Sequence, residues 1–112
     1  MNRKETQAQI INALEDTKAQ EITVLDVRKK SDMTDFMIIV TGNSTRHVKS
    51  MAGNLIKAMK DLGEQPFGSE GETNGEWVLV DFENIVVHIM QRDVREFYNL
   101  EKLWGTPSQD EV

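Results

Sequence analysis

The feature that most constrains this chain is an apolar run that leads directly into an amphipathic helix pattern. Residues 36–40 read Phe-Met-Ile-Ile-Val, with no polar side chain among them. A strand with one face in water alternates apolar and polar residues, so a continuous run predicts a strand covered on both faces. Residues 41–44 then resemble a turn and a helix cap, and apolar residues recur at helical spacing up to Leu62, before Gly63. We therefore expect a mixed α/β (α+β) fold in which helices pack on a sheet.

The segments before this run predict one more helix and one more strand. Thr6 can cap a helix that continues to about Lys18. Residues 22–27 are rich in β-branched side chains and predict a strand. Residues 28–32 are a polar connection.

The second half of the chain predicts a loop, a hairpin and a last helix. Residues 65–75 contain Gly, Pro and polar side chains, which is typical of a surface connection. Two strands are expected over residues 77–82 and 85–90, giving a sheet of about four to five strands. Asp93 and Glu96 resemble a capping pair for a last helix, which Gly105 and Pro107 would end.

The hairpin pattern also predicts a register. If Glu83 and Asn84 form a two-residue turn, paired positions sum to 167, so that Val80 faces Val87 and Leu79 faces His88. One face of the hairpin is then purely apolar and is expected to face the core. The opposite face, which pairs Trp77 with Met90, is also mostly apolar. It is either covered by a helix or free to contact a partner.

The charges are distributed unevenly along the chain. Residues 1–60 carry ten Lys and Arg and seven Asp and Glu, whereas residues 61–112 carry three and twelve. No basic residue occurs between Lys60 and Arg92. A surface of this composition repels phosphate backbones and suits a basic partner, although a face that only keeps the protein soluble would have the same composition.

Length and composition indicate a single domain in a reducing compartment. The 112 residues suffice for one core of moderate size, predicted over residues 1–107, and residues 108–112 are expected to be a disordered tail. The chain has no Cys, which excludes disulfides and thiolate metal sites. The N-terminal residues lack the apolar stretch of a secretory signal, and no apolar run is long enough to span a bilayer. We therefore expect a cytoplasmic protein.

The sequence contains one weak catalytic pattern. Residues 42–44, Gly-Asn-Ser, follow the apolar strand and open a helix, where nucleotidyltransferases bind a nucleotide phosphate on backbone N–H groups. Those enzymes also need a pair of acidic residues soon afterwards to hold a divalent metal, and residues 45–60 contain none. His47 and His88 lie on different elements without metal-ligand spacing. An ordinary turn is the favoured interpretation, and no enzymatic activity, cofactor or metal is expected.

Four blocks in series resemble the ribosomal silencing factor family, also called RsfS, YbeB or Iojap. They are Ser31–Val48, Glu70–Gly71 with Trp77–Phe82, Val86–Ile89, and Arg95–Trp104. Each block alone is modestly specific, but the four occur in the family's order and spacing over roughly residues 6–104. The combination is highly specific.

This resemblance implies a fold related to nucleotidyltransferases but without their activity, in agreement with the acidic residues missing after Gly42. It also implies that the chain binds large-subunit ribosomal protein fourteen on the face that meets the small subunit. Occupying that face would block subunit joining and lower translation under nutrient limitation or in stationary phase. Ribosomal proteins are basic, so the acidic stretch would speed encounter while apolar anchors supply most of the affinity.

The candidate contacts with the ribosomal protein come from the second hairpin face and from the aromatic C-terminal segment. They are Trp77, Leu79, His88, Met90, Tyr98, Leu100 and Glu101, with acidic contributions from Glu70 and Asp81. A single helix cannot bury all the large apolar residues of 97–104 on one stripe, so some must face outwards or towards a second chain. Phe97, Leu103 and Trp104 stay open between core and contact.

Two further functions stay open at this point. One is nucleotide binding at Gly42–Ser44. The other is a homodimer through the second apolar face, which could hide the ribosome-binding patch when the partner is absent. Sequence-specific nucleic-acid binding is not expected for a chain of net charge −6, although contacts of residues 28–30 with ribosomal RNA stay open.

Overall fold

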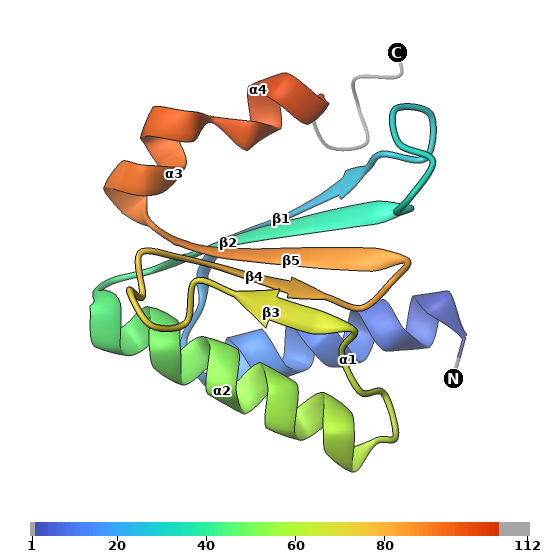
Figure 1. Ribbon diagram of the computed structural model, residues 1–112, viewed down its shortest axis with the longest axis horizontal. Helices are drawn as coiled ribbons and strands as arrows, with labels where there is room; N and C mark the ends of the chain where they lie inside the picture. The colour runs from blue at the N-terminus through green and yellow to red at the C-terminus, as the bar shows by residue number, and fades with distance from the viewer. Residues whose placement is uncertain (1, 106–112) are drawn as a thin grey trace.

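A five-stranded mixed sheet organises residues 2–105, which are the residues that this computed structural model describes (Figure 1). Its strands lie in the order β1-β2-β5-β4-β3. Their bounds are β1 Gln20–Asp26, β2 Phe36–Gly42, β3 Gly68–Glu70, β4 Trp77–Asp81 and β5 Ile85–Gln91. The β2–β5 pair is parallel and the other three pairs are antiparallel. The predicted fold class and strand number are confirmed.

Helices lie on both sides of this sheet. They are α1 Arg3–Asp16, α2 Thr45–Asp61, α3 Arg92–Tyr98 and α4 Leu100–Trp104. Figure 1 shows α1 and α2 on one side, here called the inner face, and α3 and α4 on the other, the outer face. Within residues 2–105, no helix combines the length and the apolar composition needed to cross a membrane.

The inner face holds the main hydrophobic core. The apolar stripe predicted for α2 is buried against the sheet, where Met51, Leu55 and Met59 have no exposed surface. Ile38 and Val40 of β2 and Ile89 of β5 meet this stripe from the sheet. Burying one such side chain contributes roughly 1.5–3 kcal/mol, so this layer supplies most of the stabilisation.

Strand β2 is covered on both faces, as its continuous apolar run predicts. Ile38 and Val40 belong to the inner core. Met37 and Ile39 point the other way into a second, smaller cluster that includes Leu100 of α4. The end of α2 also follows prediction, because Leu62 closes the helix and Gly63 adopts φ 83°.

The predicted hairpin register is confirmed pair by pair. Val80 lies opposite Val87, Leu79 opposite His88, and Trp77 opposite Met90. The turn is closed by the Phe82 N–H, which donates to the Ile85 carbonyl at 2.9 Å. Glu83 takes the left-handed φ of 76° that this tight turn demands, and its N–H donates to the Asp81 carboxylate at 2.8 Å.

The cap predicted within residues 41–44 is confirmed, because Ser44 caps α2, whereas the caps predicted at Thr6 and Asp93 are wrong. Asn2 caps α1 in a reciprocal capping box with Glu5, whereas Thr6 lies inside the helix and its hydroxyl donates to the Asn2 carbonyl. Gln91 is the cap residue of α3 and makes no side-chain capping bond, so Asp93 lies within the first turn instead.

Two further predictions for the second half are corrected. The loop predicted over residues 65–75 contains the short edge strand β3, which pairs with β4. The predicted single C-terminal helix is two helices, because Asn99 adopts the left-handed conformation at φ 48° and ψ 58°. The predicted roles of Pro107 and of residues 108–112 lie outside the described residues.

Candidate partner-binding surface

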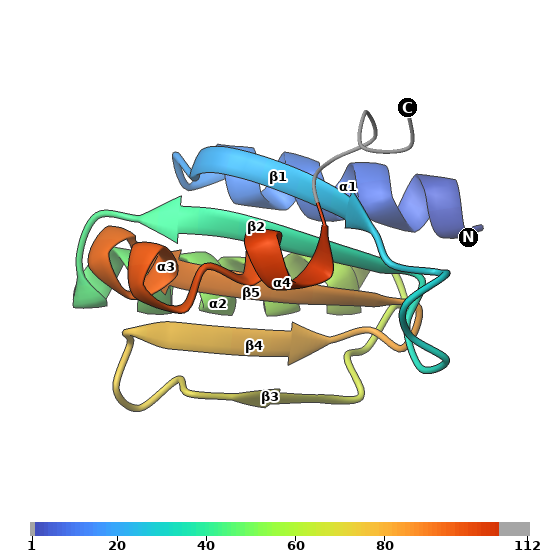
Figure 2. The same ribbon diagram turned by 90° about the horizontal axis from the view of Figure 1, so that it is seen from above.

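The outer face is covered over the middle of the sheet and open over β3 and β4. Figure 2 shows α3 and α4 above β2 and β5, with β4 and β3 to one side. Paired residues in a sheet point to the same side, so the register places Glu70, Leu79 and His88 in one row across β3, β4 and β5. Trp77 is the first residue of β4; it pairs with Met90 in the next row and lies beside Tyr98 of α3.

Aromatic rings connect the sheet to α3. The indole N–H of Trp77 donates to Nδ1 of His88 at 2.9 Å. The ring of Trp77 also lies 4.8 Å from that of Tyr98, and Tyr98 in turn packs edge-to-face with Phe97 at 5.0 Å. Spacings of 4.5–7 Å are favourable for aromatic pairs, so these four rings form one continuous group.

His88 is held neutral within this group. Its side chain is 6% exposed, and burial lowers its pKa to about 4. The bond from Trp77 requires a lone pair on Nδ1, so the neutral ring carries its proton on Nε2. His88 therefore acts as a fixed acceptor that orients Trp77.

Three large apolar side chains of the α3–α4 segment are in solvent. Phe97 is 80% exposed, Leu103 69% and Tyr98 54%. This confirms that residues 97–104 cannot all be buried on one stripe. Leu100 is the one buried member of the small outer cluster from this segment, because the left-handed Asn99 interrupts the helix and starts α4 on a new axis.

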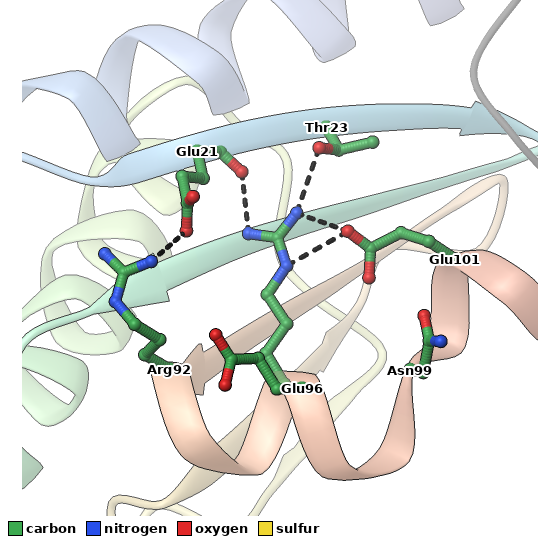
Figure 3. Close-up of a pocket in the computed structure, with 7 residues that line it drawn as sticks. Glu21, Thr23, Arg92, Glu96, Asn99 and Glu101 are labelled. Carbon is green, nitrogen blue, oxygen red and sulfur yellow. Dashed lines mark hydrogen bonds and ion pairs between the residues drawn. The ribbon is translucent and has the colours of Figure 1, made fainter.

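A buried arginine fastens the α3–α4 segment to the sheet. The guanidinium of Arg95 donates to the carboxylate of Glu101 at 2.6 and 3.1 Å. It also donates to the Glu21 carbonyl and to the hydroxyls of Thr23 and Thr41, at 2.7–2.9 Å. Figure 3 shows the bonds to Glu21, Thr23 and Glu101 as dashed lines. All five N–H groups are used, so Arg95 is a structural clamp.

A polar pocket of about 470 Å³ surrounds this clamp (Figure 3). Arg92 lies at its edge and pairs with the carboxylate of Glu21 at 2.7 Å. Glu96, Asn99 and Glu101 complete the lining. Its two cationic groups, Arg92 and Arg95, are paired with the carboxylates of Glu21 and Glu101, so that within residues 2–105 no unpaired cation lines the space.

The predicted contact residues divide into two groups. Trp77, Leu79, Tyr98, Glu70 and Asp81 reach the surface of the outer face or its edge. A shallow pocket of about 250 Å³ lies between Glu70, Gly71, Trp77 and Leu79. Asp81 is half-buried, and one of its carboxylate oxygens accepts a hydrogen bond from the Glu83 N–H in the β4–β5 turn. This group brings aromatic, aliphatic and acidic side chains together.

The second group supports the surface instead of forming it. Met90 has no exposed surface, which corrects its prediction as a direct contact. His88 and Leu100 are below a tenth exposed and hold Trp77 and α4 in place. Glu101 is bound by Arg95 and is not directed at the aromatic group. Strand alternation showed which way Met90 points, but it could not show that α3 and α4 cover it.

Phe97, Leu103 and Arg95 are residues of the candidate surface or of its support that the sequence did not assign. The first two were left open between core and contact, and their exposure excludes them from the core. The sequence did contain an indication of the role of Arg95. Thr23 and Thr41 place hydroxyl groups on the outer face of β1 and β2, next to apolar residues, and both accept hydrogen bonds from Arg95. The hydroxyl of Thr41 is fully buried and needs a hydrogen-bond partner, which the Arg95 guanidinium supplies.

The Gly42–Ser44 turn has a structural role. Ser44 caps α2 by accepting from the His47 N–H at 3.1 Å. His47 accepts from the Asn43 N–H at 2.8 Å, and its other ring nitrogen lies 2.6 Å from the Thr17 carbonyl. A Cβ on Gly42 would come within 2.7 Å of Val48, so the glycine is required for packing. Within residues 2–105, no three potential metal ligands cluster together.

Comparisons with known protein families, curated proteins and solved structures all find matches that cover most of the chain. A family model described as "Ribosomal silencing factor during starvation" matches residues 1–112. The chain is 50% identical over 96 residues to ribosomal silencing factor RsfS of Haemophilus influenzae, covering 86% of this chain and 94% of that protein. It is 36% identical over 105 residues to "Mitochondrial assembly of ribosomal large subunit protein 1" of Mus musculus, covering 91% of this chain and 46% of that protein. A crystal structure of a Chromobacterium violaceum protein matches with a TM-score of 0.93 and 42% identity, covering 96% of this chain and 90% of that one.

Proposed function

The chain belongs to the ribosomal silencing factor family, whose members are non-enzymatic, ribosome-binding regulators of translation, and from this premise we propose how it acts. It binds the large ribosomal subunit in the cytoplasm through ribosomal protein fourteen and blocks joining of the small subunit. The name of the Mus musculus relative, which refers to the ribosomal large subunit, supports the choice of subunit.

The observation that carries this proposal is the group of exposed and half-buried aromatic and apolar side chains on the outer face. It comprises Phe97, Tyr98 and Leu103 of the α3–α4 segment, with Trp77 and Leu79 of β4. Interfaces depend on a few such anchors, with Trp and Tyr the most effective. Within residues 2–105, the structure places no other element over these side chains.

The charge around this group fits a basic protein. Glu70, Glu72, Glu76 and Glu83 are exposed in the β3–β4 region and at the hairpin turn, and no Lys or Arg lies between residues 60 and 92. Complementary charge speeds encounter and fixes orientation, whereas the apolar anchors slow dissociation. Inhibition is then steric, because a bound chain occupies the surface that the small subunit needs, and its extent follows concentration and affinity.

The test is co-sedimentation with isolated ribosomal subunits, followed by a subunit-joining assay. The protein should sediment with the large subunit only and suppress joining. Trp77→Ala should weaken binding roughly 30-fold, which corresponds to ~2 kcal/mol. Trp104→Ala is the matched control, since Trp104 packs against the small outer cluster as Trp77 does, but the ring contacts of the aromatic group found in residues 2–105 do not include it. Binding of a folded Trp77→Ala variant at parental affinity would remove the aromatic group from the interface.

A second candidate is self-association through the same side chains. Phe97 and Leu103 expose large apolar side chains on the same face of the molecule. A second copy of the chain could cover both in a symmetric dimer. Such a dimer would compete with the ribosomal protein for one surface. Sedimentation velocity across concentrations measures it, and Phe97→Ser should shift the protein towards monomer while also weakening ribosome binding.

A further inference from the structure

Helix α2 lies on the opposite side of the sheet from α3 and α4 (Figure 1). A row of basic side chains runs along its solvent side. Arg46, Lys49, Lys57 and Lys60 are all exposed, with Gly53 at the centre of the row. At 3.6 residues per turn, these five positions fall within about 80° of the helix circumference and extend over about 21 Å. We call them the α2 basic stripe.

Most of the positive charge of the stripe is unpaired. Residues 45–60 contain no acidic residue. Lys57 pairs with Asp61 at 3.1 Å, in an exposed contact that is weak in water. No ion pair within 4.0 Å involves Arg46, Lys49 or Lys60 in the part of the chain that the structure describes. The molecule thus carries positive charge on α2 and negative charge around β3 and β4.

Gly53 is an independent sign that something approaches this helix closely. Glycine within a helix is destabilising relative to alanine, so it normally needs a packing reason. Here a Cβ would meet no atom within 4 Å, and φ lies outside the range that favours glycine. The chain itself gives no reason for glycine. A glycine that leaves the backbone bare between flanking cations suits the approach of another backbone.

From these observations we propose that the α2 basic stripe is a second interaction surface, which binds the phosphate backbone of ribosomal RNA. The proposal rests on the proposed function, because a chain docked on the large subunit is surrounded by RNA. Exposed Lys and Arg at intervals of one to two helical turns match a row of phosphates and read no base sequence. The outer face would then hold the ribosomal protein while the opposite side of the molecule contacts RNA.

The decisive measurement is the salt dependence of binding to salt-washed large subunits. Each lysine–phosphate contact contributes roughly 0.7–0.9 to the slope of log affinity against log salt. Lys49→Gln with Lys60→Gln should therefore lower the slope by about 1.5 and weaken binding about 10-fold at low salt. Lys29→Gln with Lys30→Gln changes the net charge equally, in the β1–β2 loop. An unchanged slope in the stripe variant, or a lowered slope in the loop variant alone, overturns the proposal.

Gly53→Gln tests the close approach without changing charge. The substitution should raise the midpoint of thermal unfolding and yet weaken binding to large subunits about 5-fold, a combination that a purely structural glycine would not produce. Ala8→Gln on the exposed side of α1 is the control and should leave binding unchanged. Gly53→Gln binding at parental affinity overturns the role of the glycine.

A third measurement separates this proposal from the proposed function. Protein-free large-subunit RNA should bind the parent more tightly than the Lys49→Gln, Lys60→Gln variant, and Trp77→Ala should not affect it. If the parent fails to bind intact subunits, the proposed function is wrong. The measurement with protein-free RNA then still tests whether the α2 basic stripe binds RNA. If the stripe variant loses affinity for phosphatidylglycerol vesicles, or for a second copy of the chain, but not for RNA, the proposal that the stripe binds RNA is overturned.

Discussion

The two faces of the sheet are built from alternating residues of the same strands, yet they are closed in different ways. The inner face lies under two helices of 14 and 17 residues and excludes water with aliphatic side chains. The outer face lies under helices of seven and five residues, which are attached by the polar clamp of Arg95 and by the smaller apolar cluster around Leu100. Apolar burial stabilises without direction, whereas a clamp of directed hydrogen bonds specifies one geometry.

This difference explains how the molecule can expose large apolar side chains and still fold. The inner core supplies the stability, so the outer face does not need to bury Phe97 or Leu103. The clamp instead fixes the position of the α3–α4 segment over β2 and β5 while leaving β4 open. Separating stability from recognition in this way allows an interface to retain groups that a single-core protein would bury.

The largest expected effect comes from a matched pair of leucines, one from each face. Leu55→Ala should lower the free energy of unfolding by roughly 2–5 kcal/mol, because it opens a cavity in the inner core. Leu103→Ala should change it by less than about 0.5 kcal/mol, since the side chain is 69% exposed. Urea titration measures both. A large loss for Leu103→Ala would show that the outer segment contributes to global stability and would break the comparison.

The clamp should be the most sensitive position of the outer face. Arg95→Met leaves the carboxylate of Glu101 without its cationic partner and removes the donor to the hydroxyl of Thr41, which together costs roughly 3 kcal/mol. Arg92→Met removes only an exposed pair with Glu21 and should cost about 0.5 kcal/mol or less. Hydrogen exchange should show the loss in α3, α4 and their contacts while α2 stays protected. Equal effects of the two substitutions would refute the clamp.

The pH dependence should also distinguish the faces. Burial lowers the pKa of His88 to about 4 from an unfolded value of 6.5, so between these values only the unfolded state binds the proton. The stabilising contribution is therefore complete above pH 6.5 and falls by up to roughly 3 kcal/mol as the pH drops towards 4. His88→Asn, which keeps an acceptor for Trp77, should remove this component. Identical pH profiles for parent and variant would contradict it.

The sequence predicted the inner face better than the outer one, for physical reasons. Alternation and a two-residue turn predicted the β4–β5 register, because a slip of one residue would break the separation between the purely apolar face and the face that carries His88. The apolar stripe of α2 was equally clear. Strand β3 was missed because its residues, Gly-Ser-Glu, have low strand propensity and form a strand only by pairing with β4.

The sequence predicted which residue types form the candidate surface, but it did not predict which of them α3 and α4 would bury. Trp77 and Tyr98 could be identified from the concentration of aromatic residues, and Glu70 from the charge. That Met90 is buried and Phe97 exposed depends on where the chain bends after α3. The bend occurs at Asn99, a residue that a helical pattern tolerates, so nothing local marked it before the structure was known.

The bend itself provides the smallest and most specific test of the comparison. Asn99 holds φ at 48°, a conformation that costs most L residues about 1–2 kcal/mol and that glycine adopts freely. Asn99→Gly should therefore change the free energy of unfolding by less than about 0.5 kcal/mol, whereas Asn99→Ala should lower it by about 1 kcal/mol. Because the strain acts on the α3–α4 segment alone, Asn99→Ala should increase hydrogen exchange there before it does so in α2. Uniform exchange across both faces would mean that the segment opens only with the core, and that the two faces form one cooperative unit.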